Sequence, residues 1–354
     1  MIYVVSTIIV LAVLIFVHEL GHFTFAKLFK VHVLKFSIGF GPKIFSFKRK
    51  ETEYMVSLIP FGGFVKLLGE DKEEEIDETL KEYSYNSKSP LQRILIIFGG
   101  PLFNLIFAAL LFSFLFMKGV PVLGPYVGGV QKGLPAESAG IKPGDKIVEI
   151  SNVKIRSWDD ISEIISRSNG KKLRIVIQRG NEKVTVFIKP KKREYKDIFG
   201  EKKERYFIGI YADTTKFKIV HYNPFYSIWL GVKETGKWIK LTFLSIVKII
   251  ERVIPLNTIG GPILIGQIAG QQAKAGATNF LFFLAMISVN LGILNLLPIP
   301  ILDGGHIVII TLEAIRGKEI DIKKIEFVQK IGLSLILVLM FFAFYNDILR
   351  LIKG

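Results

Sequence analysis

Two histidines and a glutamate at the end of the first apolar segment have the spacing of a zinc site. His18, Glu19 and His22 form the pattern His-Glu-x-x-His. Side chains four residues apart lie on one face of a helix, so both imidazoles can reach one metal ion. Glu19 is then placed to take a proton from a water molecule at that ion. The same residues are also compatible with a polar helix end that its neighbours satisfy.

Asp303 is the predicted third metal ligand, since catalytic zinc usually has three protein ligands. It follows Pro298 and Pro300, which interrupt the third apolar block. Irregular backbone at membrane depth is tolerated where it lines a cavity. A turn aspartate at a helix N-cap would show the same sequence. His306 is a further possible ligand, but we expect it to cap or pack.

The composition limits the metal chemistry and the partners. Among 354 residues there are five histidines and no cysteine, so disulfides and cysteine-based zinc sites are excluded. Half of the residues are hydrophobic and the formal net charge is +16. We expect this positive charge to interact with the anionic surface of a lipid bilayer. No compact basic patch with interleaved aromatic residues indicates a nucleic-acid partner.

Four apolar blocks are long enough to cross a bilayer, for which about 20 residues suffice. They cover residues 2–29, 91–117, 280–312 with its break, and 331–351. The first lacks the basic start and small-residue cleavage site of a signal peptide, so we expect a retained helix. The predicted fold is a polytopic α-helical membrane protein with four transmembrane helices.

Basic residues in the short loops predict the orientation in the membrane. They concentrate after the first block and before the last one, and such loops face the cytoplasm. Both termini and the central hydrophilic region are then expected on the extracytoplasmic side.

Three further elements are expected between the blocks. Alternating apolar residues around residues 43–48 and 53–58 predict a β-hairpin that dips into the membrane. A small α+β unit contains predicted strands at 173–178 and 183–188 and a helix from 158 to 168 capped by Ser157. The predicted organisation is as follows: first transmembrane helix 1–30, cytoplasmic-side hairpin and loop 31–90, second transmembrane helix 91–119, inserted α+β domain 120–190, linker and interfacial amphipathic helix 191–279, third transmembrane helix 280–312, cytoplasmic loop 313–330, and fourth transmembrane helix 331–354.

These motifs together resemble those of the site-2 proteases, and within them the bacterial regulator-of-sigma-E protease type. The matching segments cover nearly the whole chain in the same order: His18–His22, Ser37–Pro42, Phe98–Asn104, Gly261–Ile263 and Asn295–Gly305. The resemblance implies Zn²⁺ held by His18, His22 and Asp303, with Glu19 as the catalytic acid and base. It implies Asn295 and Asn104 as polar groups near the substrate backbone. An amide in an apolar helix could equally join two helices, and for Asn104 both interpretations stay open.

The inserted domain resembles a PDZ domain, most clearly over Leu134–Ile147. Tyr126–Val130, with Gly128 and Gly129, corresponds to the loop that receives a peptide carboxylate. Such a domain can bind a C-terminus by strand addition. It can also keep bulky ectodomains from the active site, and we favour this filter. Many proteins of this type have two PDZ domains, whereas this chain has room for one.

The resemblance implies an intramembrane zinc endopeptidase of the inner (cytoplasmic) membrane. Its substrates would be single-pass membrane proteins cut within their transmembrane segments. The alternative is a non-catalytic membrane scaffold that recruits partners through its PDZ domain. An inactive homologue should lack Glu19 or a ligand, and none is missing here.

Overall fold

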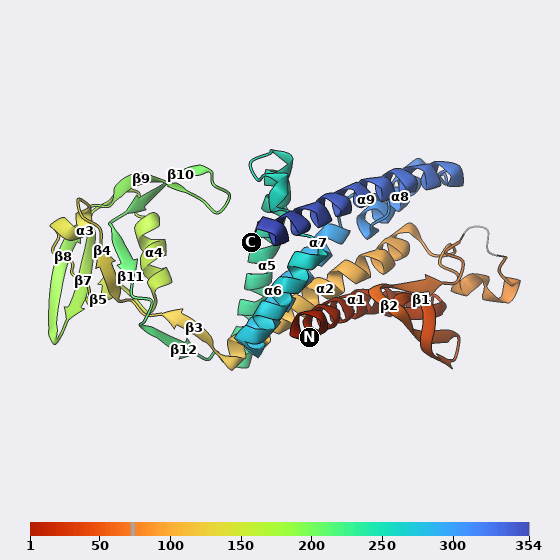
Figure 1. Ribbon diagram of the computed structural model, residues 1–354, viewed down its shortest axis with the longest axis horizontal. Coiled ribbons are helices and arrows are strands. Elements are labelled where there is room, and N and C mark those ends of the chain that lie inside the picture. Colours follow the sequence, from red (N-terminus) through yellow and green to blue (C-terminus); the bar gives the residue numbers. More distant parts are fainter. Residues whose placement is uncertain (72–74, 354) are drawn as a thin grey trace. The chain divides into compact units, whose positions relative to one another are not determined.

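The computed structural model describes residues 1–71 and 75–353 (Figure 1). The chain forms two compact units. The first contains residues 1–115 and the chain from 224 onward, and the second contains residues 116–223.

Four helices of the described chain are long and apolar enough to cross a membrane. They are α1 (Ile2–Leu28), α2 (Pro90–Lys118), α7 (Ala277–Asn295) and α9 (Ile322–Lys353). The last helix begins nine residues before the predicted position at 331. Asp321 explains the earlier start, because its carboxylate accepts a hydrogen bond from the Lys323 N–H at 2.8 Å. The basic stretch that was expected as a cytoplasmic loop therefore includes the first turns of α9.

A loop separates α7 from α8 (Asp303–Arg316) at the predicted break in the third apolar block. Gly304 and Gly305 bring the start of α8 against this loop. A Cβ at Gly305 would lie 2.5 Å from Cα of Pro300 and 2.6 Å from the carbonyl carbon of Ile299. Only glycine fits so close an approach, and the approach places Asp303 at the first turn of α8.

The predicted hairpin is a more extensive sheet built from two long, bent strands. β1 (Val33–Arg49) and β2 (Thr52–Leu67) pair along two registers, since Lys35 lies opposite both Glu53 and Lys66. The lateral order of the segments is therefore 43–49, 52–57, 33–38 and 63–67. Positive φ angles at Gly39 and Gly62 mark the bends, where other residues would be strained. Segment 63–67 forms one outer edge of this sheet.

The described part of the first unit also contains two more α-helices, α5 and α6, and two short 3₁₀ helices, Glu78–Tyr83 and Leu256–Thr258. α5 (Pro224–Ile250) packs on α2 through a face of small residues, and a Cβ at Gly231 would lie 2.6 Å from the Ala109 carbonyl oxygen. α6 (Pro262–Ala275) packs on α1, and a Cβ at its Gly266 would lie 2.7 Å from Oγ1 of Thr7. The sequence prediction assigned this second stretch to a linker, which was wrong. Its small and polar residues lack the strong apolar pattern of a transmembrane helix, but its glycines allow a helix to pack closely on α1.

The second unit has a core of isoleucine, leucine and valine between its strands and α4 (Trp158–Ser166). Ser157 caps α4 as predicted, in a capping box with Asp160. The main sheet has the order β6-β5-β7-β8. The strands and the short helix of this unit are β3 (Val120–Leu123), β4 (Val127–Val130), α3 (Pro135–Ser138), β5 (Lys146–Ile150), β6 (Val153–Lys154), β7 (Leu173–Arg179), β8 (Glu182–Ile188), β9 (Lys191–Lys196), β10 (Lys202–Phe207), β11 (Ile210–Ala212) and β12 (Phe217–Val220).

The second unit extends beyond the predicted end at residue 190. β11 pairs with β4 and β12 pairs with β3, so the chain returns to the first strands of the unit before it leaves. Ile208 is 2% exposed and belongs to the core. Residues 191–223 are therefore part of this unit. The sequence prediction ended the domain too early because strand pairing between distant segments leaves no local signal in a charged sequence.

Candidate metal centre

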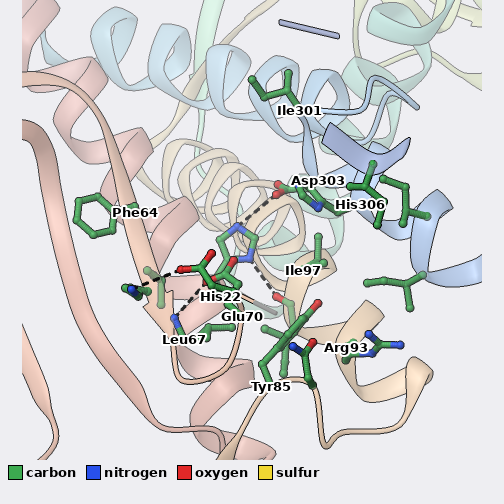
Figure 2. A pocket seen from close by; sticks show the side chains of 18 of the residues that line it. His22, Phe64, Leu67, Glu70, Tyr85, Arg93, Ile97, Ile301, Asp303 and His306 are labelled. Carbon is green, nitrogen blue, oxygen red and sulfur yellow. Dashed lines mark hydrogen bonds and ion pairs between the residues drawn. The ribbon is translucent and has the colours of Figure 1, made fainter. Parts of the chain in front are cut away.

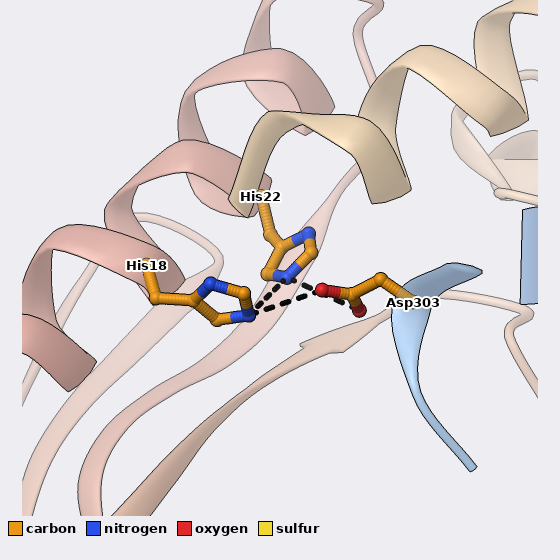
Figure 3. Close-up of side chains that lie close together, drawn as sticks. All are labelled: His18, His22 and Asp303. Carbon is orange, nitrogen blue, oxygen red and sulfur yellow. Dashed lines mark hydrogen bonds and ion pairs between the residues drawn. The ribbon is translucent and has the colours of Figure 1, made fainter. Parts of the chain in front are cut away.

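His18, His22 and Asp303 converge at one point in the first unit (Figure 3). The Nε2 atoms of the two histidines are 3.2 Å apart. Asp303 Oδ2 lies 3.2 Å from Nε2 of His18, and Oδ1 lies 3.7 Å from Nε2 of His22. One ligand atom from each residue falls within 4.8 Å of the others, and no other such group of His, Cys, Asp and Glu is found among the described residues. The helix α1 aligns the two imidazoles, and the break before α8 brings the carboxylate to them.

The other ring nitrogen of each histidine has a hydrogen-bond partner on α2. Nδ1 of His22 lies 3.0 Å from the Ile96 carbonyl oxygen, which can only accept. His22 therefore carries its proton on Nδ1, and the lone pair of Nε2 points toward Asp303.

Asn104 has the same relation to His18. Its amide nitrogen lies 3.2 Å from Nδ1 of His18, while its buried Oδ1 has no hydrogen-bond partner. The two ends of an amide have nearly the same shape, so a half-turn of this side chain places Oδ1 against Nδ1–H. In that orientation Oδ1 accepts from Nδ1–H, the amide nitrogen takes the position without a hydrogen-bond partner, and Nε2 of His18 is free to bind a metal ion.

The converging atoms fit a divalent zinc ion. Two neutral imidazoles and a carboxylate are the donor set of many catalytic zinc sites. Asp303 Oδ2 is buried without a hydrogen-bond partner, which is costly for a carboxylate unless a cation is near. A zinc ion would satisfy this oxygen and both Nε2 lone pairs.

Glycines on α1 and α2 let the two helices meet at this point. A Cβ at Gly99 would lie 2.7 Å from the Gly21 carbonyl oxygen, so the backbones are in direct contact. A Cβ at Gly100 would lie 2.8 Å from Cε1 of His18 and 2.7 Å from Cε1 of His22. The Gly99–Gly100 pair therefore allows close helix packing, and Gly100 also leaves room for both imidazoles.

A cavity of about 810 Å³ opens beside the metal centre (Figure 2). Glu19 lines it together with the outer sheet edge 63–67. Tyr85 and Arg93 line it as well, and Figure 2 draws them around the same space as His22 and Asp303. The cavity can hold a peptide next to the metal ligands and within reach of Glu19.

The remaining predicted site residues lie in three places. The amide nitrogen of Asn295, at the end of α7, lies 3.3 Å from Nε2 of His18. His306 lines the cavity but is not one of the three grouped ligands. Gly128 and Gly129 belong to β4 in the second unit, where Gly129 lies opposite Tyr211 of β11.

Sequence inspection named Asn104 on α2 but missed the roles of Arg93, Ile96 and Gly100 on the same helix. Arg93, Ile96, Gly100 and Asn104 recur every three or four residues and share one helix face. Ile96 acts through its carbonyl oxygen and Gly100 through the absence of a side chain, so neither residue type indicates the role. The helical spacing between Gly100 and Asn104 was the available signal.

Comparison with known proteins assigns the family. Residues 6–339 match Peptidase family M50, and the chain belongs to this family. Several relatives carry the name "Putative zinc metalloprotease". That of Agrobacterium fabrum is 36% identical and the match covers 99% of this chain and 96% of the relative. That of Campylobacter jejuni is 37% identical over 98% of this chain and 93% of the relative. That of Clostridium acetobutylicum is 35% identical over 98% and 97%, respectively.

Among solved structures, the PDZ domain of the SdrC-like protein from Listeria monocytogenes is similar to a quarter of the chain. It is 26% identical, covers 25% of this chain and 86% of its own, and has a TM-score of 0.21.

The family and the apolar helices establish the class of this protein. It is a zinc-dependent metalloendopeptidase and a membrane protein.

Proposed function

We propose that this protein hydrolyses peptide bonds inside the transmembrane segments of single-pass membrane proteins, with zinc held by His18, His22 and Asp303. The observation that carries the proposal is the position of the ligand group. Two of its members belong to α1, a 27-residue apolar helix of membrane-spanning length. Ionisable side chains in such helices are expensive and usually functional.

Zinc, when bound, supplies a Lewis acid for the scissile carbonyl and makes a water molecule more acidic. Glu19 lines the same cavity as the ligands and accepts the proton of the attacking water. The water oxygen bonds to the carbonyl carbon, the C–N bond breaks, and Glu19 passes the proton to the leaving amine. The amide of Asn104 orients His18 through Nδ1, whereas the amide nitrogen of Asn295 lies 3.3 Å from Nε2 of His18 and can donate to the substrate carbonyl oxygen there.

The substrate must be extended at the cleavage site, because a helix hides its carbonyl groups in hydrogen bonds. The outer edge 63–67 of the β1-β2 sheet lines the cavity, and among the described residues no strand pairs with its outer side. An extended substrate segment can add to this edge as a further strand, next to Glu19 and the metal ligands.

The first experiment compares cleavage of a purified single-pass substrate by the wild-type protein, Glu19→Gln and His22→Ala, with and without a zinc chelator. We expect the wild type to cut within the apolar segment, and Glu19→Gln to bind zinc without cutting. His22→Ala should lose both properties. A wild-type protein that binds zinc but cuts no transmembrane substrate contradicts the intramembrane proposal. One that neither binds zinc nor cuts favours the scaffold alternative.

The edge-strand proposal has a matched control in the opposite edge of the same sheet. Proline at Val65 or Lys66 tests two consecutive positions, one of which directs its N–H outward. Proline at Phe45 or Ser46 makes the same change at the far edge 43–49. We expect at least about a tenfold loss of turnover for one of the first pair, a lost hydrogen bond in a desolvated site being worth about 1–3 kcal/mol. Equal turnover for both edges refutes this substrate-binding mode.

We further propose an inner-membrane protein with both termini and the second unit on the extracytoplasmic side. The basic loops support this orientation. Since the chain has no cysteine, a single cysteine introduced at exposed Ser151 or Lys318 reports its own location. A membrane-impermeant maleimide should label Ser151→Cys but not Lys318→Cys in cells with a permeable outer envelope, and the opposite pattern refutes the orientation.

The second unit, which resembles a PDZ domain in sequence, is proposed to act as a size filter for substrate ectodomains. Substrates with a folded ectodomain should then be cut only after that domain is removed. Equal cleavage of long and shortened substrates refutes the filter.

A further inference from the structure

α8 carries Asp303 at its first turn, and its far end is attached to α2 by a buried ion pair. Nη2 of Arg93 lies 3.6 Å from Oε2 of Glu313, and the two side chains are 14% and 7% exposed. Glu313 lies ten residues after Asp303, about 15 Å along the helix. Its Oε1 also accepts a hydrogen bond from the Ile320 N–H at 3.1 Å, in the connection to α9. Glu313 thus links the end of α8 to α2 and to the following segment.

Arg93 begins the same face of α2 that holds the two histidines. Moving along this face from Arg93, the chain presents the Ile96 carbonyl to His22, the gap at Gly100 to both imidazoles, and Asn104 to His18. α2 is therefore a common support for the ligands from α1. Through Arg93 it is also attached to the helix that supplies Asp303.

The ion pair between Arg93 and Glu313 lies at the wall of the cavity beside the metal centre. Both residues line the cavity that contains Glu19 and the metal ligands, and Figure 2 shows Arg93 there. The Nε atom of Arg93 is buried without a hydrogen-bond partner. Buried ion pairs add little stability compared with well-packed apolar residues, so their presence often has a positional reason.

We propose that Arg93 and Glu313 are positioning residues for the metal centre. Their ion pair holds α8 against α2 and so keeps the Asp303 carboxylate at His18 and His22. This inference rests on the proposed role of Asp303 as the third zinc ligand. The site motifs on α1 and α8 alone leave the distance between these helices unspecified, and the pair at the other end of α8 supplies that constraint.

The test measures zinc affinity in the full-length protein by competition with a chromophoric chelator, together with kcat and KM on a single-pass substrate. Arg93→Gln and Glu313→Gln remove one charge each, and the glutamine at 313 can still accept from the Ile320 N–H. Arg93→Lys keeps the charge. Arg350→Met is the matched control, since it removes a cation paired with Asp347 of the same unit outside the cavity lining.

We expect Arg93→Gln and Glu313→Gln each to weaken zinc binding about 10- to 100-fold, the range for groups that orient metal ligands. The double variant should bind zinc no more weakly than the more strongly affected single variant, because both changes break the same interaction. Arg93→Lys and Arg350→Met should bind zinc within about threefold of the wild type, as expected for changes that leave the interaction in place.

Wild-type zinc affinity and kcat in Arg93→Gln overturn the proposal. So does a loss that adds in full in the double variant, or one that Arg350→Met shares. Failure of the proposed function is distinguishable, because Asp303→Asn would then leave zinc affinity unchanged in the wild-type background.

Discussion

Gly100→Ala adds a single methyl group beneath both candidate histidine ligands. The added carbon would lie 2.7 and 2.8 Å from Cε1 of His22 and His18, and closer still to Nε2 of His22. Carbon atoms in van der Waals contact are about 3.5–4.0 Å apart, so each ring must retreat by about 0.7 Å or more. Metal sites tolerate about 0.2 Å. The backbones of α1 and α2 are already in contact at Gly21 and Gly99 and cannot absorb the change.

Overpacking of this kind costs about 1–3 kcal/mol, which corresponds to a loss of about 5- to 150-fold in zinc affinity. Helix propensity acts in the opposite direction, because alanine in a helix interior is about 0.5–1 kcal/mol more favourable than glycine. Gly236→Ala in α5 is the control, since a Cβ there meets nothing within 4 Å. It should be neutral or slightly stabilising.

The assay is zinc competition in detergent, with thermal unfolding measured in parallel. We expect Gly100→Ala to lose zinc affinity and activity together while Gly236→Ala keeps both. Unchanged zinc affinity in Gly100→Ala would show that the helices or the rings have room to adjust, and the reasoning from close packing would be wrong.

Three other perturbations separate the parts of the molecule. Gly63→Ala would place a Cβ 3.1 Å from Cγ of Glu19 and 2.7 Å from the Ser37 carbonyl oxygen. Because the methyl group displaces Glu19 and not the metal ligands, kcat should fall roughly tenfold at unchanged zinc affinity. A parallel loss of zinc binding would contradict this. Asp347 in α9 accepts from the N–H groups of Gly261, Ile263 and Leu264 at 2.9–3.0 Å, so Asp347→Ala should destabilise the first unit by about 1–3 kcal/mol in thermal unfolding; an unchanged melting temperature would show that these donors find other acceptors. In the second unit, burial alone would raise the pKa of Asp145, but hydrogen bonds from Arg179 and the Lys142 N–H outweigh it and hold the pKa below its usual value. The stability from this depressed pKa is present above about pH 4 and lost as the pH falls below it, which amide hydrogen exchange of β5 and β7 measures. Arg179→Met should lower protection at neutral pH, and equal protection in both proteins would refute the role of the pair.

Much of the local structure was predictable because it depends on short-range geometry. The spacing of His18 and His22 places them on one helix face, and Ser157 with Asp160 predicts the start of α4. These features need only the neighbouring residues in the chain.

The errors share a different cause. α6 was assigned to a linker, and strands β9 to β12 were placed outside the inserted domain. α6 packs on α1 through its glycines, and β11 and β12 pair with the distant strands β4 and β3, whereas β9 and β10 pair with each other. Neither segment has the strong periodicity or hydropathy on which the prediction relied.

The sequence by itself determined that His18, Glu19 and His22 meet on one helix of membrane-spanning length, since helical periodicity and hydropathy act over a few turns. It also showed that two prolines interrupt the third apolar block just before Asp303. The tertiary structure alone decided how α2 orients both imidazoles, that the edge 63–67 rather than 43–49 lines the cavity, and that Arg93 meets Glu313. Those relations depend on the packing of helices and strands that are remote in the chain, and packing depends on shape and on satisfying buried polar groups, which no local pattern encodes.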